Sequence, residues 1–160
     1  MISGGYRTLL RGYRHLPKRL RRRLVRWIAP SFTAGAMCVI EREDGAVLLV
    51  RHAYRPFWGC PGGLLQRGEE PGAAARREVK EEVGLDVEIL TEPLILLDWR
   101  ARRIDVVFQG RVQPPVPDVV EPASGEIVEV RWFARHLLPV LQAEAAEALA
   151  RMSEQAKRED

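Results

Sequence analysis

Cysteine is scarce in this 160-residue chain, which contains only Cys38 and Cys60. A disulfide-stabilised scaffold is therefore excluded, and a reducing compartment is expected. The sequence has no run of about eighteen apolar residues, so it predicts no transmembrane helix, and its first residues lack the apolar core and cleavage site of a secretory signal. We therefore expect a cytoplasmic protein. The hydrophobic fraction of 46% is that of a globular domain and excludes collagen-like or wholly disordered chains.

Acidic residues are absent from residues 1–30, which contain nine Lys or Arg. The other 130 residues contain sixteen basic and twenty-two acidic residues, so this part of the chain has a net charge of −6. The overall charge of +3 therefore combines a short basic segment with an acidic body. For this reason the high isoelectric point alone does not indicate a nucleic-acid binding protein.

Residues 17–28 are predicted to form an amphipathic helix, in which Pro17 is tolerated in the first turn. Apolar residues recur every four positions along it: Leu16, Leu20, Leu24 and Ile28. We expect this stripe to pack either on the body of the same subunit or on a second subunit. Only the second arrangement would make a homodimer. Contact with an anionic membrane surface is the less favoured alternative. Residues 1–30 are thus expected to form a basic helical extension, and residues 31–160 the main domain.

The pattern after Phe32 predicts a β-hairpin with Asp44–Gly45 at its tip. The segment 55–69 is rich in glycine and proline and is expected to be a loop. A helix is expected from Pro71 to Val83, ended by Gly84. Further expected elements are strands at 85–99, 103–112 and 126–133, a surface loop at 113–125 and a helix at 135–155. This order predicts a single α/β or α+β sandwich.

Three glutamates of the predicted helix share one face, which we expect to be exposed. Glu78, Glu81 and Glu82 stand at i, i+3 and i+4, and carboxylates at this spacing repel one another. A hard divalent cation such as Mg²⁺ is a natural counter-charge. The alternative is a solvated surface balanced by the cations of the same helix, which are Arg76, Arg77 and Lys80.

Residues 63–85 resemble the Nudix box at every defined position. The matching residues are Gly63, Glu69, Arg77-Glu78-Val79, Glu81-Glu82 and Gly84-Leu85. Nine specified residues at fixed spacing are far more specific than a lone glycine motif. The flanking strands are also similar to those of this family over roughly residues 32–150. The resemblance therefore implies a Nudix-type α/β/α sandwich with a mixed β-sheet, to which the N-terminal amphipathic helix is added.

The resemblance also implies a metal-dependent pyrophosphohydrolase. Such an enzyme cleaves a diphosphate linkage, most often in a nucleoside di- or triphosphate or a nucleoside diphosphate derivative, by attack of a metal-activated water on phosphorus. The implied cofactor is Mg²⁺, with Mn²⁺ as a substitute. The implied metal ligands are Glu78, Glu81, Glu82 and the carbonyl of Gly62. Glu81 and Glu82 are also implied to be catalytic, and Arg77 and Glu69 to orient the carboxylates.

Residues outside the box supply further candidates. Glu121 and Glu126 are candidates for the general base, and the alternative is that they are a plain loop charge and a strand-edge charge. Arg51 and Arg55 precede the Pro-Gly-Gly turn and would hold substrate phosphates as guanidinium forks, or else be solvated loop residues. Structural roles are expected for the three histidines, whose spacing suits no metal: His15, His52 and His136.

Three hypotheses of function remain open at this point. The first is the pyrophosphohydrolase acting on a small phosphoanhydride such as a nucleotide. The second is a catalytically silent binding module with the same fold. The third is a pyrophosphohydrolase of nucleic-acid 5′ ends that docks through basic residues 1–30. Substrate identity is not predicted. Two downstream markers known in the family, a proline that accompanies ADP-ribose cleavage and a tyrosine that accompanies dinucleoside polyphosphate cleavage, are absent around Ala101–Arg103.

Overall fold

The computed structural model describes residues 17–21, 23 and 29–159 of the chain. The chain divides into two compact units, Met1–Phe32 and Thr33–Asp160. In the first unit, residues 18–21 are helical, which agrees with part of the predicted helix. The rest of that helix, and the packing expected for it, lie outside the described residues. Within the described part of the chain, no helix is both long and apolar enough to cross a membrane.

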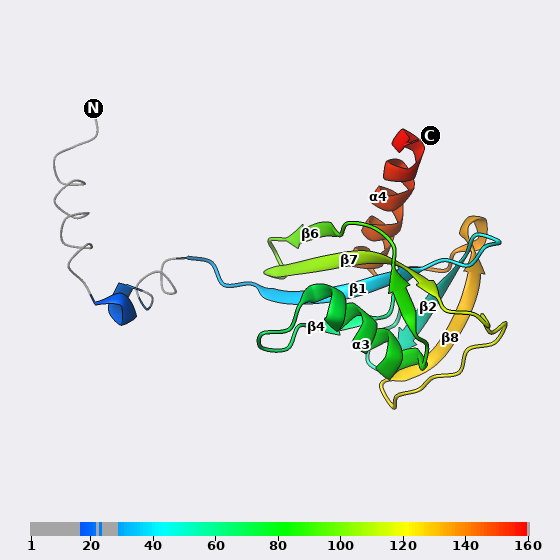
Figure 1. Ribbon diagram of the computed structural model, residues 1–160, viewed down its shortest axis with the longest axis horizontal. Helices are drawn as coiled ribbons and strands as arrows, with labels where there is room; N and C mark the ends of the chain where they lie inside the picture. The colour runs from blue at the N-terminus through cyan, green and yellow to red at the C-terminus, as the bar shows by residue number, and fades with distance from the viewer. Residues whose placement is uncertain (1–16, 22, 24–28, 160) are drawn as a thin grey trace. The chain divides into compact units, whose positions relative to one another are not determined.

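The second unit contains two β-sheets (Figure 1). The larger sheet has the order β4-β1-β7-β5, and β6 also pairs with β7. Its strands are β1 (Thr33–Ile40), β4 (Gly62–Leu64), β5 (Val87–Ile89), β6 (Leu94–Asp98) and β7 (Arg103–Val112). The smaller sheet has the order β3-β2-β8, formed by β2 (Ala46–His52), β3 (Trp58–Gly59) and β8 (Ile127–Ala134). The larger sheet is mixed, because β1 and β7 are parallel and its other pairs are antiparallel.

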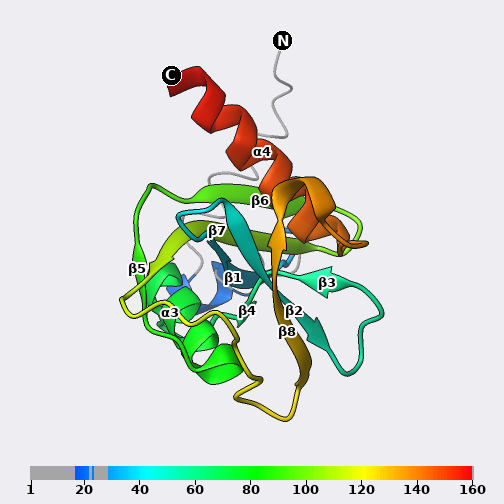
Figure 2. The ribbon, with the colours of Figure 1, turned by 90° about the vertical axis from the view of Figure 1, so that its right-hand side faces the viewer.

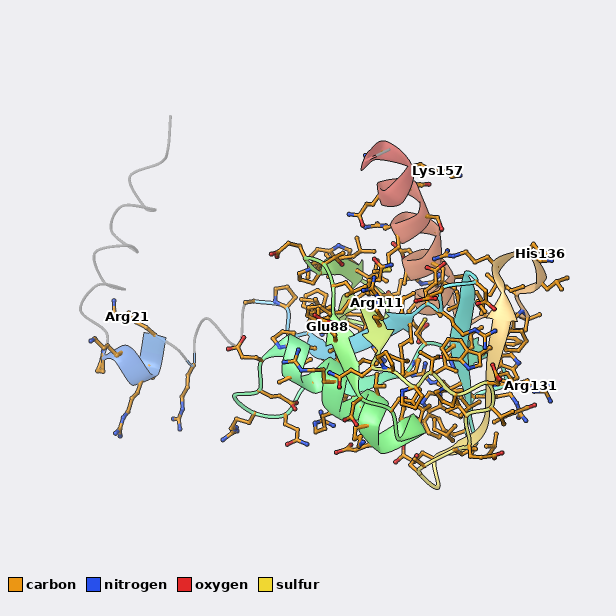
Figure 3. All side chains as sticks on the ribbon, turned by 45° about the vertical axis from the view of Figure 1, so that its right-hand side comes forward. Arg21, Glu88, Arg111, Arg131, His136 and Lys157 are labelled. Carbon is orange, nitrogen blue, oxygen red and sulfur yellow. The ribbon has the colours of Figure 1, made fainter. Side chains whose placement is uncertain are left out.

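Two long helices complete this unit, α3 (Pro71–Val83) and α4 (Ala143–Glu159) (Figure 2). A 3₁₀ turn, η1 (Arg135–Leu137), follows β8 and carries His136, which is labelled in Figure 3. The predicted single helix over 135–155 is therefore wrong at its start. Pro139 lies between η1 and α4, and a proline excludes continuous helix through the residue before it.

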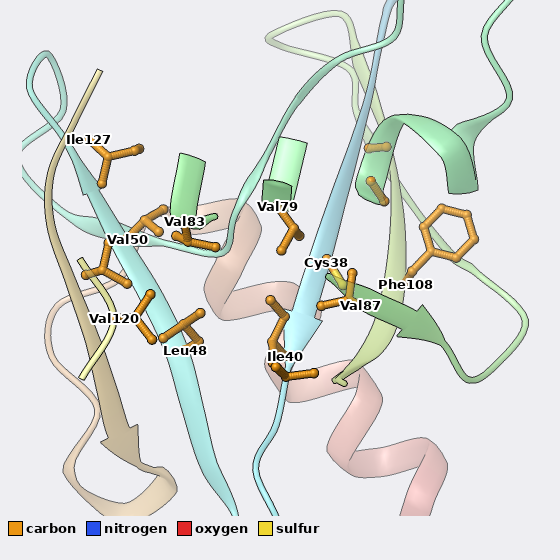
Figure 4. Packing of buried hydrophobic residues seen from close by; sticks show 14 of the residues in the cluster. Cys38, Ile40, Leu48, Val50, Val79, Val83, Val87, Phe108, Val120 and Ile127 are labelled. Atoms are coloured by element: carbon orange, nitrogen blue, oxygen red, sulfur yellow. The ribbon is translucent and has the colours of Figure 1, made fainter. Parts of the chain in front are cut away.

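The helices cover opposite faces of the larger sheet. Alternate residues of a strand point to opposite faces, and those of β1 enter two different apolar clusters. Cys38 and Ile40 pack in the first cluster with α3 and with residues of the smaller sheet (Figure 4). Met37 and Val39 pack in the second cluster with α4. This arrangement confirms the predicted mixed α/β sandwich.

The predicted hairpin around Asp44–Gly45 is wrong, although the turn itself forms. Gly45 has φ of 79°, a left-handed conformation that favours glycine. The strands on either side, β1 and β2, enter different sheets, and the bridge Glu41–Val47 and the hydrogen bond from the Arg42 N–H to the Ala46 carbonyl link only the residues next to the turn. Both strands are almost continuously apolar and are buried on both faces. Such strands lack the polar alternation that would identify the partner.

Two other predicted segments are subdivided in the structure. The expected strand at 85–99 is two strands, β5 and β6, with Pro93 just before the second. The expected loop at 55–69 contains the short strands β3 and β4. These pair with β2 and β1 respectively, so the Pro-Gly-Gly segment connects the two sheets. The candidate site lies at this connection.

Candidate active site

The helix α3 holds the glutamates in place because its other face is locked into the core. The helix begins with Pro71, whose missing N–H costs nothing there, and ends at Gly84 in a left-handed conformation with φ of 71°. Its apolar stripe, Ala75, Val79 and Val83, is buried against the sheet. The adjacent stripe, which carries the glutamates, is thereby fixed at the edge of the larger sheet.

The glutamates face a cavity of about 560 Å³. Glu78, Glu81 and Glu82 line it from α3, and Gly62 and Gly63 line it from β4. Residues far apart in the sequence are therefore assembled at one site, as the resemblance implied. A cavity of this size suits a nucleotide-sized ligand.

Arg77 forms the centre of an ion-pair network beside this cavity. Its Nε and Nη2 donate to the two carboxylate oxygens of Glu69 over 2.8 and 3.0 Å. Its Nη1 donates to Glu78 over 2.8 Å and to Glu81 over 3.1 Å. The Arg77 guanidinium, with the Gln66 backbone N–H, lowers the pKa of Glu69 to about 2. The contact expected between Arg77 and Glu69 is thus present, and it also reaches two of the cavity glutamates.

The glutamate face is not uniformly exposed, contrary to the expectation from sequence. The Glu81 side chain is 56% exposed, whereas Glu82 is only 6% exposed. Glu82 accepts a hydrogen bond from the Gly62 backbone N–H over 3.1 Å, and its other oxygen lies 3.1 Å from His52 Nε2. The difference arises because β4 and the end of β2 cover one end of the glutamate stripe.

His52 was expected to be structural, and the structure places it in the wall of the cavity. The side chain is buried, and among the described residues its Nδ1 has no hydrogen-bond partner. Donation to Glu82 requires the proton on Nε2, which leaves Nδ1 as an acceptor. No spacing in the sequence indicates this contact, because it depends on the packing of α3 against the face of β2 that carries Leu48 and Val50.

Glu78 occupies space that the absence of a side chain at Gly63 provides. A Cβ atom at Gly63 would lie 2.6 Å from Cδ of Glu78, so any side chain here would require the Glu78 carboxylate to move. Burial raises the pKa of Glu78, and the hydrogen bond from Arg77 opposes this rise. The glycine therefore fixes how deeply this carboxylate sits against β4.

The donor set of the cavity suits a hard cation, although its carboxylates are engaged by protein groups. Among the residues that the structure describes, no three His, Cys, Asp or Glu side chains are arranged as a metal centre. Cys60 also lines the cavity, but burial raises its pKa to about 12, so it stays a thiol. The carboxylate and carbonyl oxygens that line the cavity are the ligands that Mg²⁺ prefers.

The other predicted site residues divide into two groups. Glu126 and Arg55 line the cavity, whereas Glu121 and Arg51 are not among its lining residues. Arg51 instead pairs with Glu129 across β2 and β8, through Nη2 over 2.8 Å. The structure therefore gives no support to the phosphate-binding role expected for Arg51.

Several residues of the cavity wall were not found by sequence reasoning. They are Tyr54, Gln66, Ser124, Gln142 and Glu144. Arg55 donates to both Gln142 and Glu144, the latter over 2.6 Å, so the start of α4 borders the cavity. These residues come from separate elements, and their proximity depends on the topology of the two sheets rather than on any local motif.

Comparison with known proteins gives one family. Residues 31–156 match the family model described as the NUDIX domain. The chain is 40% identical over 104 residues to a MutT-like protein of Streptomyces ambofaciens, a match that covers 65% of each chain. It is 34% identical over 109 residues to the 8-oxo-dGDP phosphatase NUDT18 of Mus musculus, covering 64% of this chain and 32% of the mouse protein. The chain thus spans less than two thirds of either relative.

Solved structures share the fold. An ADP-ribose pyrophosphatase of Streptococcus suis is 30% identical, with a TM-score of 0.65, over 80% of this chain and 92% of that one. A NUDIX hydrolase of Nitrosomonas europaea is 24% identical, with a TM-score of 0.68, over 81% of this chain and 74% of that one. The second likeness shows the fold alone.

Proposed function

Because the chain belongs to the NUDIX family, we propose that it is a Mg²⁺-dependent pyrophosphohydrolase that cleaves a diphosphate linkage in a nucleotide-derived substrate. One observation carries this proposal: Glu78, Glu81 and Glu82 line a single cavity together with the backbone of Gly62. Two of the relatives described above are named for 8-oxo-dGDP and for ADP-ribose, both of which contain a diphosphate.

The proposed metal ligands are the three glutamates and the carbonyl of Gly62. When bound, Mg²⁺ would neutralise phosphate oxygens and activate the attacking water. Glu81 is the most exposed of the three carboxylates, and within the described part of the chain its side chain accepts a hydrogen bond from Arg77 alone. Glu82 is oriented by two protein donors, and Glu78 by Arg77 and by the space at Gly63.

We assign the general base to Glu126 rather than to Glu121. Glu126 lines the cavity immediately before β8, whereas Glu121 lies in the preceding loop and does not line it. The backbone carbonyl of Glu126 accepts a hydrogen bond from the Ala53 N–H over 2.9 Å, which ties this residue to the end of β2. A carboxylate so placed would accept a proton from the attacking water.

A substrate panel tests the proposal. Purified protein would be incubated with ADP-ribose, 8-oxo-dGDP, nucleoside triphosphates and a dinucleoside polyphosphate, with Mg²⁺ or with EDTA, and the products separated by ion-exchange chromatography. We expect turnover of at least one diphosphate compound, dependent on Mg²⁺, with both halves of the cleaved bond recovered. Binding of these compounds without any turnover would instead support the catalytically silent module.

A further inference from the structure

Arg103 lines the same cavity as the glutamates, from the first residue of β7. Its Nε lies 2.7 and 2.8 Å from the two carboxylate oxygens of Asp105. Asp105 is buried, with 3% of its surface exposed. One edge of the guanidinium is therefore anchored to a carboxylate inside the sheet, which fixes the direction of the whole side chain.

A glycine in the neighbouring strand makes room for this pair. Gly35 of β1 stands opposite Asp105 of β7 and opposite Leu64 of β4. A Cβ atom at Gly35 would lie 2.6 Å from Asp105 Oδ1 and 3.1 Å from Arg103 Nη2. Any side chain at this position would therefore displace the ion pair.

The same glycine shows where the guanidinium points. The Cβ position of Gly35 is 3.1 Å from Arg103 Nη2 and also 3.1 Å from the carbonyl oxygen of Gly63. These two atoms therefore lie within about 6 Å of one another. The Arg103 side chain thus crosses the face of β1 and ends beside β4, next to the backbone of Gly62 and Gly63.

Arg77 and Arg103 differ in how many of their N–H donors are bound to protein acceptors. Arg77 uses Nε, Nη1 and Nη2 for protein acceptors. In the described part of the chain, the side-chain hydrogen bonds of Arg103 run from Nε alone, to Asp105. Its two Nη groups are therefore available for a ligand. A guanidinium edge held in a fixed direction matches the oxygens of a phosphoryl group, which it binds through two parallel hydrogen bonds.

We propose that Arg103 is a substrate-binding residue that holds a phosphoryl group of the diphosphate, and that Gly35 and Asp105 position it beside β4. The inference deepens the proposed function, since its ligand is the diphosphate of the substrate. It adds a cationic contact to the cavity that the glutamates also line, so that the diphosphate would be held by this arginine as well as by the metal on the carboxylates.

Binding of methylenediphosphonate, a diphosphate that cannot be hydrolysed at its bridge, tests the inference. Calorimetric titration of the full chain in excess Mg²⁺ should show binding that Arg103→Gln weakens about tenfold or more, as expected for loss of a charged hydrogen bond. Arg103→Lys keeps a cation for Asp105 and should fold like the wild type, yet it should also bind more weakly because an ammonium cannot form the two parallel bonds.

The matched control is Arg111→Gln. Arg111 lies on the same strand, β7, is exposed, and stands opposite Glu88 of β5 (Figure 3). This variant should bind methylenediphosphonate like the wild type. Equal binding by the wild type and both Arg103 variants would overturn the inference, and so would absence of binding by the wild type. Because this assay involves no turnover, its outcome is independent of whether the substrate panel shows hydrolysis.

Discussion

The pair formed by Glu69 and Arg77 lies behind the carboxylates of the cavity, and its charge state predicts a pH dependence. The pKa of Glu69 is about 2 in the folded protein, below its ordinary value of 4.5. The folded state therefore binds fewer protons at this site than the unfolded state. The stability that the pair contributes is complete above about pH 4.5 and is lost as the pH falls toward 2.

Glu69→Gln should accordingly lower the free energy of unfolding near neutral pH. The difference from wild type should shrink as the pH falls below 4.5, because Glu69 of the wild type then binds a proton in the unfolded state, which lowers the free energy of unfolding of the wild type alone. Urea unfolding of both proteins at intervals from pH 7 to pH 3 measures this difference. A difference that stays constant over this range would contradict an ionised pair.

His52 predicts an effect on metal binding that is separate from turnover. Its Nε2 orients the buried carboxylate of Glu82, which we propose as a ligand. His52→Leu removes this donor and should weaken Mn²⁺ binding to the protein about tenfold, as is usual for partners of metal ligands. His52→Gln retains an N–H donor and should weaken it less. Electron paramagnetic resonance measures the Mn²⁺ affinity of each protein. Equal affinity in both variants and the wild type would contradict the orienting role of His52.

Some of these residues could be predicted from the sequence and others could not. The box glutamates and the Arg77–Glu69 pair follow from fixed spacing within one helix and its preceding turn, and the structure brings them together. The contact of His52 with Glu82 does not follow from any spacing, because it joins separate segments. Arg103 and Asp105 stand two residues apart on one strand, but their place at the cavity depends on the topology of the sheets. Burial of Glu82 was missed for the same reason, since β2 and β4 cover it.

At the scale of elements, the short strand β4 determines where the helix glutamates can sit. Gly63 has no Cβ, and the carboxylate of Glu78 occupies that space. Gly63→Ala should therefore displace Glu78 and lower turnover about tenfold or more, a loss comparable to that from disturbing groups around a metal site. Steady-state kinetics on the substrate found in the panel measures this effect.

The control for this change is Gly125→Ala. A Cβ atom at Gly125 would meet nothing within 4 Å, and this glycine lies in the loop before β8. Its turnover and its unfolding temperature should match those of the wild type. If both alanine variants turned over substrate at the wild-type rate, the position of Glu78 against β4 would have no role in activity.

The predicted elements are correct where local sequence signals are strong, and they are wrong where the structure depends on which strands pair. Helix α3 has a proline start, a glycine end and an apolar stripe, and its predicted bounds are confirmed. Strands β1 and β2 are adjacent in sequence and joined by a good turn, yet they belong to different sheets. Strands that are apolar on both faces can be buried in either sheet, so local sequence did not settle the pairing.

At the scale of the whole molecule, the chain combines a basic N-terminal segment with the NUDIX-matching region. Among the described residues, those that line the cavity lie between Met37 and Glu144. Deletion of residues 1–30 should therefore leave kcat for a small substrate within about twofold of wild type, as for a segment outside the domain boundary. A large fall in kcat in a truncated protein with native circular dichroism would show that the segment contributes to the site.

The central claim is that the carboxylates facing the cavity hold the metal for diphosphate hydrolysis, and Glu82→Gln tests it most directly. The amide oxygen of glutamine can still accept from the Gly62 N–H, so the fold should persist. Turnover in Mg²⁺ of the substrate found in the panel should fall about 100-fold or more, because several kcal/mol of metal-ion catalysis would be lost. Glu147→Gln, on the half-exposed surface of α4, should keep the wild-type rate. A folded Glu82→Gln protein with the wild-type rate would contradict the account.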